Sequence, residues 1–241
     1  MLMRVFVILP AAGLGTRMAT GHGTPQSPKQ FLELGGIPVL IHTLRAFAAV
    51  PSVTRMYVAV RAGEMERVEA QVSEHGLADK VRVVMGGDSR QESVSHALAA
   101  VECDDEDILL VHDAVRPLIE PAVIERTIEA AQKSGAAIVG LPAVDTINQV
   151  ERTADGALIT ATIPREYIVQ AQTPQGFRAG LLRRAFAEAE ADGFTGTDEA
   201  SVVERAGAQV MVVPGSPTNL KITQPGDLDL AEFYLRQRAS R

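Results

Sequence analysis

The chain has 241 residues, 46% of them hydrophobic, which is enough to build the core of one α/β domain. The chain has 23 Lys and Arg against 30 Asp and Glu, which gives a formal net charge of -7. This charge argues against a general affinity for nucleic acid or for anionic membranes. No apolar stretch approaches the roughly 20 residues of a membrane span, the start shows no leader pattern, and the single cysteine lies among carboxylates, so we expect a cytoplasmic protein without disulfides or a nucleophilic cysteine.

Five short apolar runs rich in β-branched residues divide the first part of the chain. They span residues 4–10, 54–60, 80–86, 107–113 and 136–142. Runs of this kind predict strands that are buried on both faces. Helical patterns lie between them, at 37–50, 63–76, 89–101 and 121–135. The alternation predicts right-handed βαβ units and a doubly wound, mostly parallel sheet of the α/β class, whose ligands bind beyond the carboxyl ends of the strands.

Residues 143–172 change the pattern to two alternating runs on either side of Asp155-Gly156, which predict a β-hairpin. No helical segment is available to cover its apolar side chains. We therefore favour a projecting arm that another copy of the chain buries, over a hairpin folded back on its own domain. The rest of the chain predicts helices at 178–193, 197–207 and 225–238 and strands at 208–215 and 219–223, so that residues 1–241 form a single domain with one arm.

The stretch PAAGLGTRM, residues 10–18, leaves the first predicted strand and is expected to cross the carboxyl edge of the sheet. It matches neither the P-loop, since no G-K-[ST] follows, nor the dinucleotide fingerprint, since Met18 stands where the third glycine belongs. A tight turn is the structural alternative. Small residues here would let a ligand approach backbone N–H groups, and Arg17 and Lys29 add positive charge for phosphate oxygens. The small residues are Ala11, Ala12, Gly13 and Gly15.

Asp113 ends the fourth predicted strand, in VHDAVRP, and is expected at the same sheet edge as the glycine loop. One carboxylate there suits Mg²⁺, which keeps several waters and takes further ligands from substrate phosphates. A structural ion pair with Arg116 is the alternative, and the nearby glycine loop favours the metal. We expect His112 to be a hydrogen-bonded core histidine, because no second ligand follows at metal-binding spacing.

The segment GGDSRQESV follows the third predicted strand and opens a helix, so that Asp88, Ser89, Arg90 and Ser93 could bond a base or a sugar, although Asp88 or Ser89 could simply cap the helix. Zinc-hydrolase, paired C-x-x-C and nucleophile-elbow motifs are absent from the sequence. Aromatic residues are only 4%, which argues against stacking surfaces for single strands.

Eight segments, in order and over nearly the whole chain, resemble the 2-C-methyl-D-erythritol 4-phosphate cytidylyltransferase family of the non-mevalonate isoprenoid pathway. They are PAAGLGTRM, PKQF, GGDSRQESV, VHDAVRP, DTINQV, IPREYIVQAQTPQGF, GTDEASVVERAG and NLKIT. The set in register is highly specific. Two departures are a longer loop between Met18 and Pro28 and Val115 in place of the alanine of many members.

The resemblance implies a Rossmann-like nucleotidyltransferase fold and transfer of a cytidylyl group from CTP to methylerythritol phosphate, with Mg²⁺ as cofactor and pyrophosphate as leaving group. It implies a triphosphate loop of Ala11, Ala12, Gly13, Gly15, Arg17 and Lys29, cytidine contacts at Gly87, Asp88 and Ser93, a magnesium ligand at Asp113 flanked by Ala114 and Arg116, and a second cation, Lys221, on the α-phosphate. It also implies a homodimer in which Thr146 and Arg165 of the arm bind the acceptor in the partner's active site, with Arg116 as a further acceptor contact.

The acceptor phosphate is already a nucleophile at neutral pH, so the reaction needs alignment and charge neutralisation and no general base. The nearest alternative is a ribitol-5-phosphate cytidylyltransferase, because acceptor identity depends on the hairpin. A sugar-1-phosphate nucleotidyltransferase fits Thr16-Arg17 but not the downstream SPKQF. A non-catalytic nucleotide-binding module would bind CTP without releasing pyrophosphate.

Overall fold

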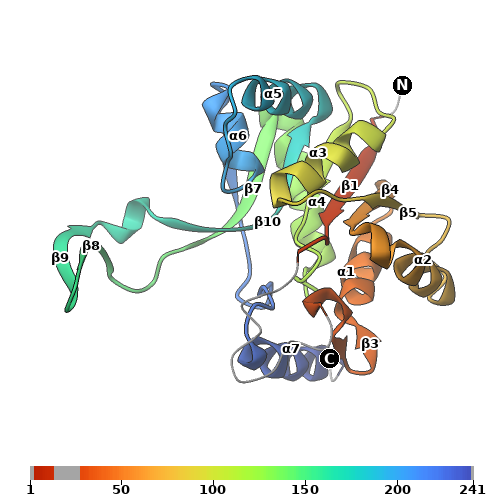
Figure 1. Cartoon of the computed structure of the whole chain (residues 1–241), viewed down its shortest axis with the longest axis horizontal. Coiled ribbons are helices and arrows are strands. Elements are labelled where there is room, and N and C mark those ends of the chain that lie inside the picture. Colours follow the sequence, from red (N-terminus) through yellow and green to blue (C-terminus); the bar gives the residue numbers. More distant parts are fainter. Residues whose placement is uncertain (1–2, 14–27, 240–241) are drawn as a thin grey trace.

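A computed structural model describes residues 3–13 and 28–239 of the chain (Figure 1). Gly15, Arg17 and the long loop after Met18 lie outside these residues. Within them, no helix is both long enough and apolar enough to cross a membrane.

Seven strands form the main sheet, in the order β11-β7-β10-β6-β1-β4-β5. They are β1 (Val5–Pro10), β4 (Val53–Val60), β5 (Val81–Met85), β6 (Ile108–Val111), β7 (Ala136–Pro142), β10 (Val169–Arg178) and β11 (Met211–Pro214). All neighbours run parallel except β10, which pairs antiparallel with both β6 and β7. The predicted mostly parallel α/β sheet is confirmed.

Helices cover both faces of this sheet, as a doubly wound fold requires. They are α1 (Val39–Ala48), α2 (Met65–Glu74), α3 (Arg90–Ala100), α4 (Pro121–Ser134), α5 (Ala179–Ala191) and α6 (Glu199–Arg205); a further helix, α7 (Pro225–Ala239), packs in a separate cluster. Successive side chains of a strand point to opposite faces. Accordingly, Val7 and Leu9 pack with α1, α2 and α4, whereas Phe6 and Ile8 pack with α3, α5 and α6.

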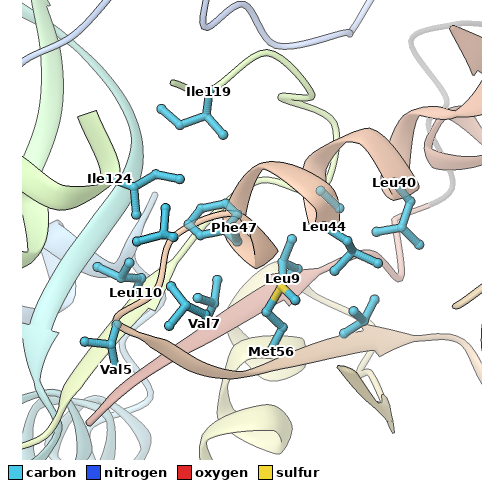
Figure 2. Packing of buried hydrophobic residues seen from close by; sticks show 14 of the residues in the cluster. Val5, Val7, Leu9, Leu40, Leu44, Phe47, Met56, Leu110, Ile119 and Ile124 are labelled. Carbon is cyan, nitrogen blue, oxygen red and sulfur yellow. The ribbon is translucent and has the colours of Figure 1, made fainter. Parts of the chain in front are cut away.

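Figure 2 shows the first of these two cores, where Leu40, Leu44 and Phe47 of α1 lie against Leu9 and Met56 of the central strands. A smaller third cluster joins α7 to the short hairpin of β2 (Glu33–Leu34) and β3 (Ile37–Pro38). β1 and β6 are paired, parallel neighbours in the sheet. The segments that leave their carboxyl ends therefore meet at one edge of the sheet.

The arm, residues 143–168, extends away from the body of the molecule (Figure 1). Its strands β8 (Ile147–Thr153) and β9 (Gly156–Ile163) form a separate antiparallel hairpin that leaves Leu158 63% and Ile159 64% exposed. The predicted projecting hairpin is therefore present. Its predicted end at residue 172 is wrong, because β10 begins at Val169 and belongs to the main sheet.

The strand predicted at 219–223 is also wrong, because this segment is irregular in the structure. Asn219 is buried there, and its side chain donates to the backbone oxygen of Thr173 (2.8 Å). The backbone N–H of Ile222 donates to the oxygen of Val115 (2.9 Å). These bonds hold the segment, and with it Lys221, against the turn that follows β6.

Candidate active site

A cavity of about 200 Å³ opens at the carboxyl edge of the sheet, where β1, β5 and β6 end. It brings together most of the residues predicted to bind the nucleotide and the metal. These are Ala11, Ala12, Gly13, Lys29, Gly87, Asp88, Ser93, Asp113, Ala114 and Lys221. They come from segments far apart in sequence, and the parallel strands place them side by side.

Two side chains hold the start of the glycine loop by donating hydrogen bonds to its carbonyl groups. The buried Gln30 side chain donates to the oxygen of Ala11 (2.7 Å), and Arg61 donates to the oxygen of Ala12 (2.7 Å). Within residues 3–13 and 28–239, the N–H groups of Ala12 and Gly13 find no protein acceptor. Backbone N–H groups arranged in this way bind anions. Gln30 and Arg61 were not among the predicted site residues, although they lie next to Lys29 and to the end of the second predicted strand.

Asp113 is surrounded by three cations. Its carboxylate lies 2.9 Å from Lys221 Nζ, 3.2 Å from Arg116 Nε and 3.4 Å from Arg90 Nε. Burial alone would raise the pKa of Asp113, but Lys221, Arg90 and Arg116 outweigh it and hold this pKa well below its usual range. The carboxylate is therefore ionised at neutral pH, and the ion pair with Arg116 is present.

A second cavity, of about 210 Å³, borders the same charge cluster. It shares Arg90, Asp113 and Lys221 with the first cavity and adds Arg116 together with Thr197 and Asp198, the two residues just before α6. Two ligands, one in each cavity, would therefore both lie next to two cations, Arg90 and Lys221, and one carboxylate, Asp113.

Residues 5–237 match the sequence profile of the family described as 2-C-methyl-D-erythritol 4-phosphate cytidylyltransferase. The chain belongs to this family. It is 83% identical to the 2-C-methyl-D-erythritol 4-phosphate cytidylyltransferase of Acidobacterium capsulatum over 99% of this chain and 100% of that one, and 53% identical to that of Solibacter usitatus, over 99% and 98%. The crystal structure of the Thermus thermophilus enzyme of the same name superimposes with a TM-score of 0.77 at 35% identity, covering 97% of this chain and 100% of the other.

Family membership confirms the predicted enzyme class, a cytidylyltransferase, and the predicted fold. The substituted Val115 is accommodated, because it is buried against α7 in the third core cluster.

The predicted cytidine contacts lie around the start of α3. Ser93 is 1% exposed; its Oγ accepts from the N–H of Gly87 (3.1 Å) and donates to the oxygen of Ser89 (2.8 Å). Ser89 caps the helix in a capping box with Glu92, so the structural alternative holds for Ser89 and not for Asp88. A Cβ on Gly87 would come within 2.2 Å of the Glu92 side chain, the same side chain that completes the capping box. Glycine is therefore the residue that fits this position without displacing Glu92.

The predicted acceptor residues Thr146 and Arg165 line neither cavity of this chain. Both are exposed on the arm, where Arg165 donates to the oxygen of Val144 (2.6 Å). Their role in a partner's site stays a prediction. Arg116, by contrast, lines the second cavity.

A magnesium ion would fit this site together with substrate phosphates. No group of three or more His, Cys, Asp or Glu side chains that could hold a metal is found in the described parts of the chain. Asp113 is nevertheless an ionised carboxylate on the cavity wall, and Mg²⁺ is commonly held by one or two carboxylates together with substrate phosphates. This carboxylate therefore fits an ion that is bound together with the phosphates of a nucleotide.

His112 is fully buried and bonded on both ring nitrogens, as predicted for a core histidine. Nε2 lies 3.2 Å from the oxygen of Arg116, which can only accept, so Nε2 carries the proton. Nδ1 then accepts from the hydroxyl of Thr173 (3.0 Å), which in turn accepts from the N–H of Asp113 (3.1 Å). The neutral ring fixes the turn that presents Asp113. Burial lowers the pKa of His112 to about 3.

This histidine is expected to make the fold sensitive to acid. Its folded pKa of about 3 lies below the unfolded value of 6.5, so the unfolded chain binds a proton first, and stability is lost as pH falls below 6.5. The expected contribution is about 1.4 kcal/mol per pH unit down to the folded pKa. Urea unfolding of the wild type and of His112→Gln between pH 7 and pH 5 measures it. The variant is expected to show a shallower slope, and equal slopes would contradict this assignment.

Proposed function

We propose that this chain transfers the cytidylyl group of CTP to the phosphate of 2-C-methyl-D-erythritol 4-phosphate. An acceptor phosphate oxygen attacks the α-phosphorus and forms the new P–O–P bond. The bond from the α-phosphorus to the bridging oxygen of the β-phosphate breaks, and pyrophosphate leaves with its electron pair. The observation that carries the proposal is that the two cavities share Arg90, Asp113 and Lys221, so that a nucleotide in one and an acceptor in the other would both approach these charges.

The site is suited mainly to neutralising the negative charge of the reacting phosphates. Lys29 and Lys221 line the first cavity, and the N–H groups of Ala12 and Gly13 add donors for phosphate oxygens. Preorganised donors of this kind stabilise the charge that develops in the transition state. Both ring nitrogens of His112 are engaged in the fold, which agrees with a reaction that needs no general base.

Magnesium is part of the proposal. Asp113 would hold the ion together with triphosphate oxygens of CTP, and the bound ion would neutralise charge on the reacting phosphates. Arg17, whose position lies outside the described residues, is proposed to act with Lys29 and Lys221 as a third catalytic cation. A cytoplasmic location is also proposed, and the unpaired Cys103 is consistent with it.

We further propose a homodimer in which the arm of one copy completes the site of the other, within a single nucleotidyltransferase domain per chain. The exposed apolar side chains of β8 and β9 support this, because no part of the described chain covers them. Thr146 and Arg165 would then bind the acceptor across the interface.

Mixed dimers test this shared site. Chains carrying Lys221→Met and chains carrying Arg165→Met, co-expressed with two different affinity tags and purified through both, are expected to have one intact site per dimer. At subsaturating acceptor they should show about half of the wild-type activity. The matched control pairs a wild-type chain with the Lys221→Met/Arg165→Met double variant, which leaves no intact site if the arm crosses to its partner. Activity in the control and none in the test pair would place Arg165 in its own chain's site.

A substrate matrix tests the proposed reaction. The purified protein is incubated with Mg²⁺, one of the four common nucleoside triphosphates, and either methylerythritol phosphate or ribitol 5-phosphate, and pyrophosphate release is measured. Release with CTP and methylerythritol phosphate alone is the expected result. Release with ribitol phosphate instead would assign the alternative acceptor, and CTP binding without release in any mixture would indicate a non-catalytic module.

A further inference from the structure

Arg90 is held between two carboxylates at the place where the two cavities meet. It is the first residue of α3 and lines both cavities. Its Nη1 lies 2.6 Å from Glu199 Oε1, whereas its Nε lies 3.4 Å from Asp113 Oδ1. The shorter contact shows that Glu199, and not Asp113, is the stronger partner of this guanidinium.

Glu199 is the first residue of α6, and hydrogen bonds join this end of the helix to β10, the antiparallel strand of the sheet. The side chain of Gln175, on β10, donates to Asp198 Oδ2 (2.7 Å) and accepts from the N–H of Ala200 (2.9 Å). Asp198 in turn caps α6 by accepting from the N–H of Ser201 (2.9 Å). Gln175 is itself 1% exposed, so a buried side chain holds the residues on both sides of Glu199.

The burial of Glu199 is costly for the fold. The residue is 1% exposed, its Oε2 is buried without a hydrogen-bond partner among residues 3–13 and 28–239, and desolvation raises its pKa despite the opposing effect of Arg90. Buried ion pairs often stabilise a protein no more than apolar residues of similar volume would. An apolar residue could therefore fill this position if the only requirement were packing.

The neighbouring charges indicate what the carboxylate does. Asp113 already contacts Lys221 and Arg116 through Oδ2, and it contacts Arg90 through Oδ1. If Glu199 were neutral, the Arg90 guanidinium would lose its closest anion. It would then be expected to move toward Asp113, the other carboxylate that it contacts. That movement would cover Oδ1 of Asp113 and withdraw the guanidinium from the junction.

We infer that Glu199 is a positioning residue for the transfer reaction: it holds the Arg90 guanidinium at the junction of the two cavities, facing the phosphates of both substrates, and keeps it from closing onto Asp113. The inference rests on the proposed function for the identity of those substrates. Glu199 itself lines neither cavity, so it acts only through Arg90.

A double-variant cycle tests this role. Glu199→Gln keeps the shape and removes the charge, and it is expected to lower kcat by about 10²-fold while changing KM for CTP by less than about threefold, since alignment of the reacting groups is lost rather than nucleotide binding. Glu199→Asp keeps the charge and is expected to recover part of kcat. Because both residues act as a unit, Glu199→Gln combined with Arg90→Gln should lower kcat no further than Arg90→Gln alone. Asp192→Asn, which removes the exposed partner of Arg205 at the other end of α6, is the matched control and should keep the wild-type kcat.

The cycle uses whichever nucleotide and acceptor release pyrophosphate in the substrate matrix. A different productive pair therefore overturns the proposed function alone, and a wild type that releases none overturns both. A folded Glu199→Gln variant with wild-type kcat, or losses that add in the double variant, would overturn the inference while the proposed function stands. Should Glu199→Gln fail to give the wild-type circular dichroism spectrum, Glu199→Asp decides, because a wild-type kcat in that variant, with its shortened side chain, contradicts a positioning role.

Discussion

Replacing Lys221 with methionine is expected to lower kcat by about 10²- to 10³-fold, the loss typical of removing one preorganised charge or donor from a transition state. Lys221 lies at the junction of the two cavities, with Nζ 2.9 Å from Asp113 Oδ2. Methionine keeps most of the length of the side chain and removes only the charge. The loss should appear mainly in kcat, because the charge that Lys221 meets grows as the α-phosphorus is attacked.

Steady-state kinetics with each substrate varied in turn measures this effect. Lys133→Met, at the exposed end of α4, removes an equal charge far from the sheet edge that holds the cavities and should leave kcat unchanged. A Lys221→Met variant whose KM for CTP rises while its kcat stays at the wild-type value would show that Lys221 only holds the nucleotide in its ground state.

Replacing Asp113 with asparagine is expected to impair both activity and stability. The change leaves Arg90, Arg116 and Lys221 around a neutral group, and breaking a buried ion pair from one side costs about 3–5 kcal/mol. An accompanying fall in kcat of about 10²-fold or more is expected, since the site would lose its carboxylate for magnesium and its three cations would repel one another.

The stability effect has a defined pH dependence. Because the folded pKa of Asp113 is lowered from 3.8, the ionised group stabilises the fold above the unfolded pKa, and this contribution is lost as pH falls below it. The difference in unfolding free energy between the wild type and Asp113→Asn should thus be constant near neutral pH and shrink below about pH 4. Asp105→Asn, which removes the exposed partner of Arg183, is the control and should change stability far less. An Asp113→Asn protein as stable as the wild type would contradict the account of the charge cluster.

Much of the site follows from the order of elements in the sequence. Buried apolar runs that alternate with helical patterns predict a parallel sheet, and a parallel sheet places the ends of β1, β5 and β6 at one edge. That rule alone brings the glycine loop, the start of α3 and Asp113 together, as the structure confirms for every described member of the set.

The predictions for the end of the arm and for residues 219–223 failed because long-range contacts, which a local sequence pattern does not show, determine the structure there. Residues 169–172 alternate like the hairpin before them, yet β10 continues through them and inserts antiparallel between β6 and β7. Lys221 lies in an irregular segment because Asn219 bonds to β10 and Ile222 bonds to the turn after β6. The contact of Arg90 with Glu199 joins residues 109 positions apart, and only the folded chain brings them together.

The most direct test of the proposed reaction is phosphorus NMR of the protein incubated with CTP, methylerythritol phosphate and Mg²⁺. Transfer predicts two coupled signals of a new diphosphate diester, together with pyrophosphate, as the signal of the acceptor monophosphate disappears. Formation of CMP and pyrophosphate with the acceptor signal unchanged would show hydrolysis of CTP instead, and would contradict the proposal that the acceptor phosphate attacks the α-phosphorus in this site.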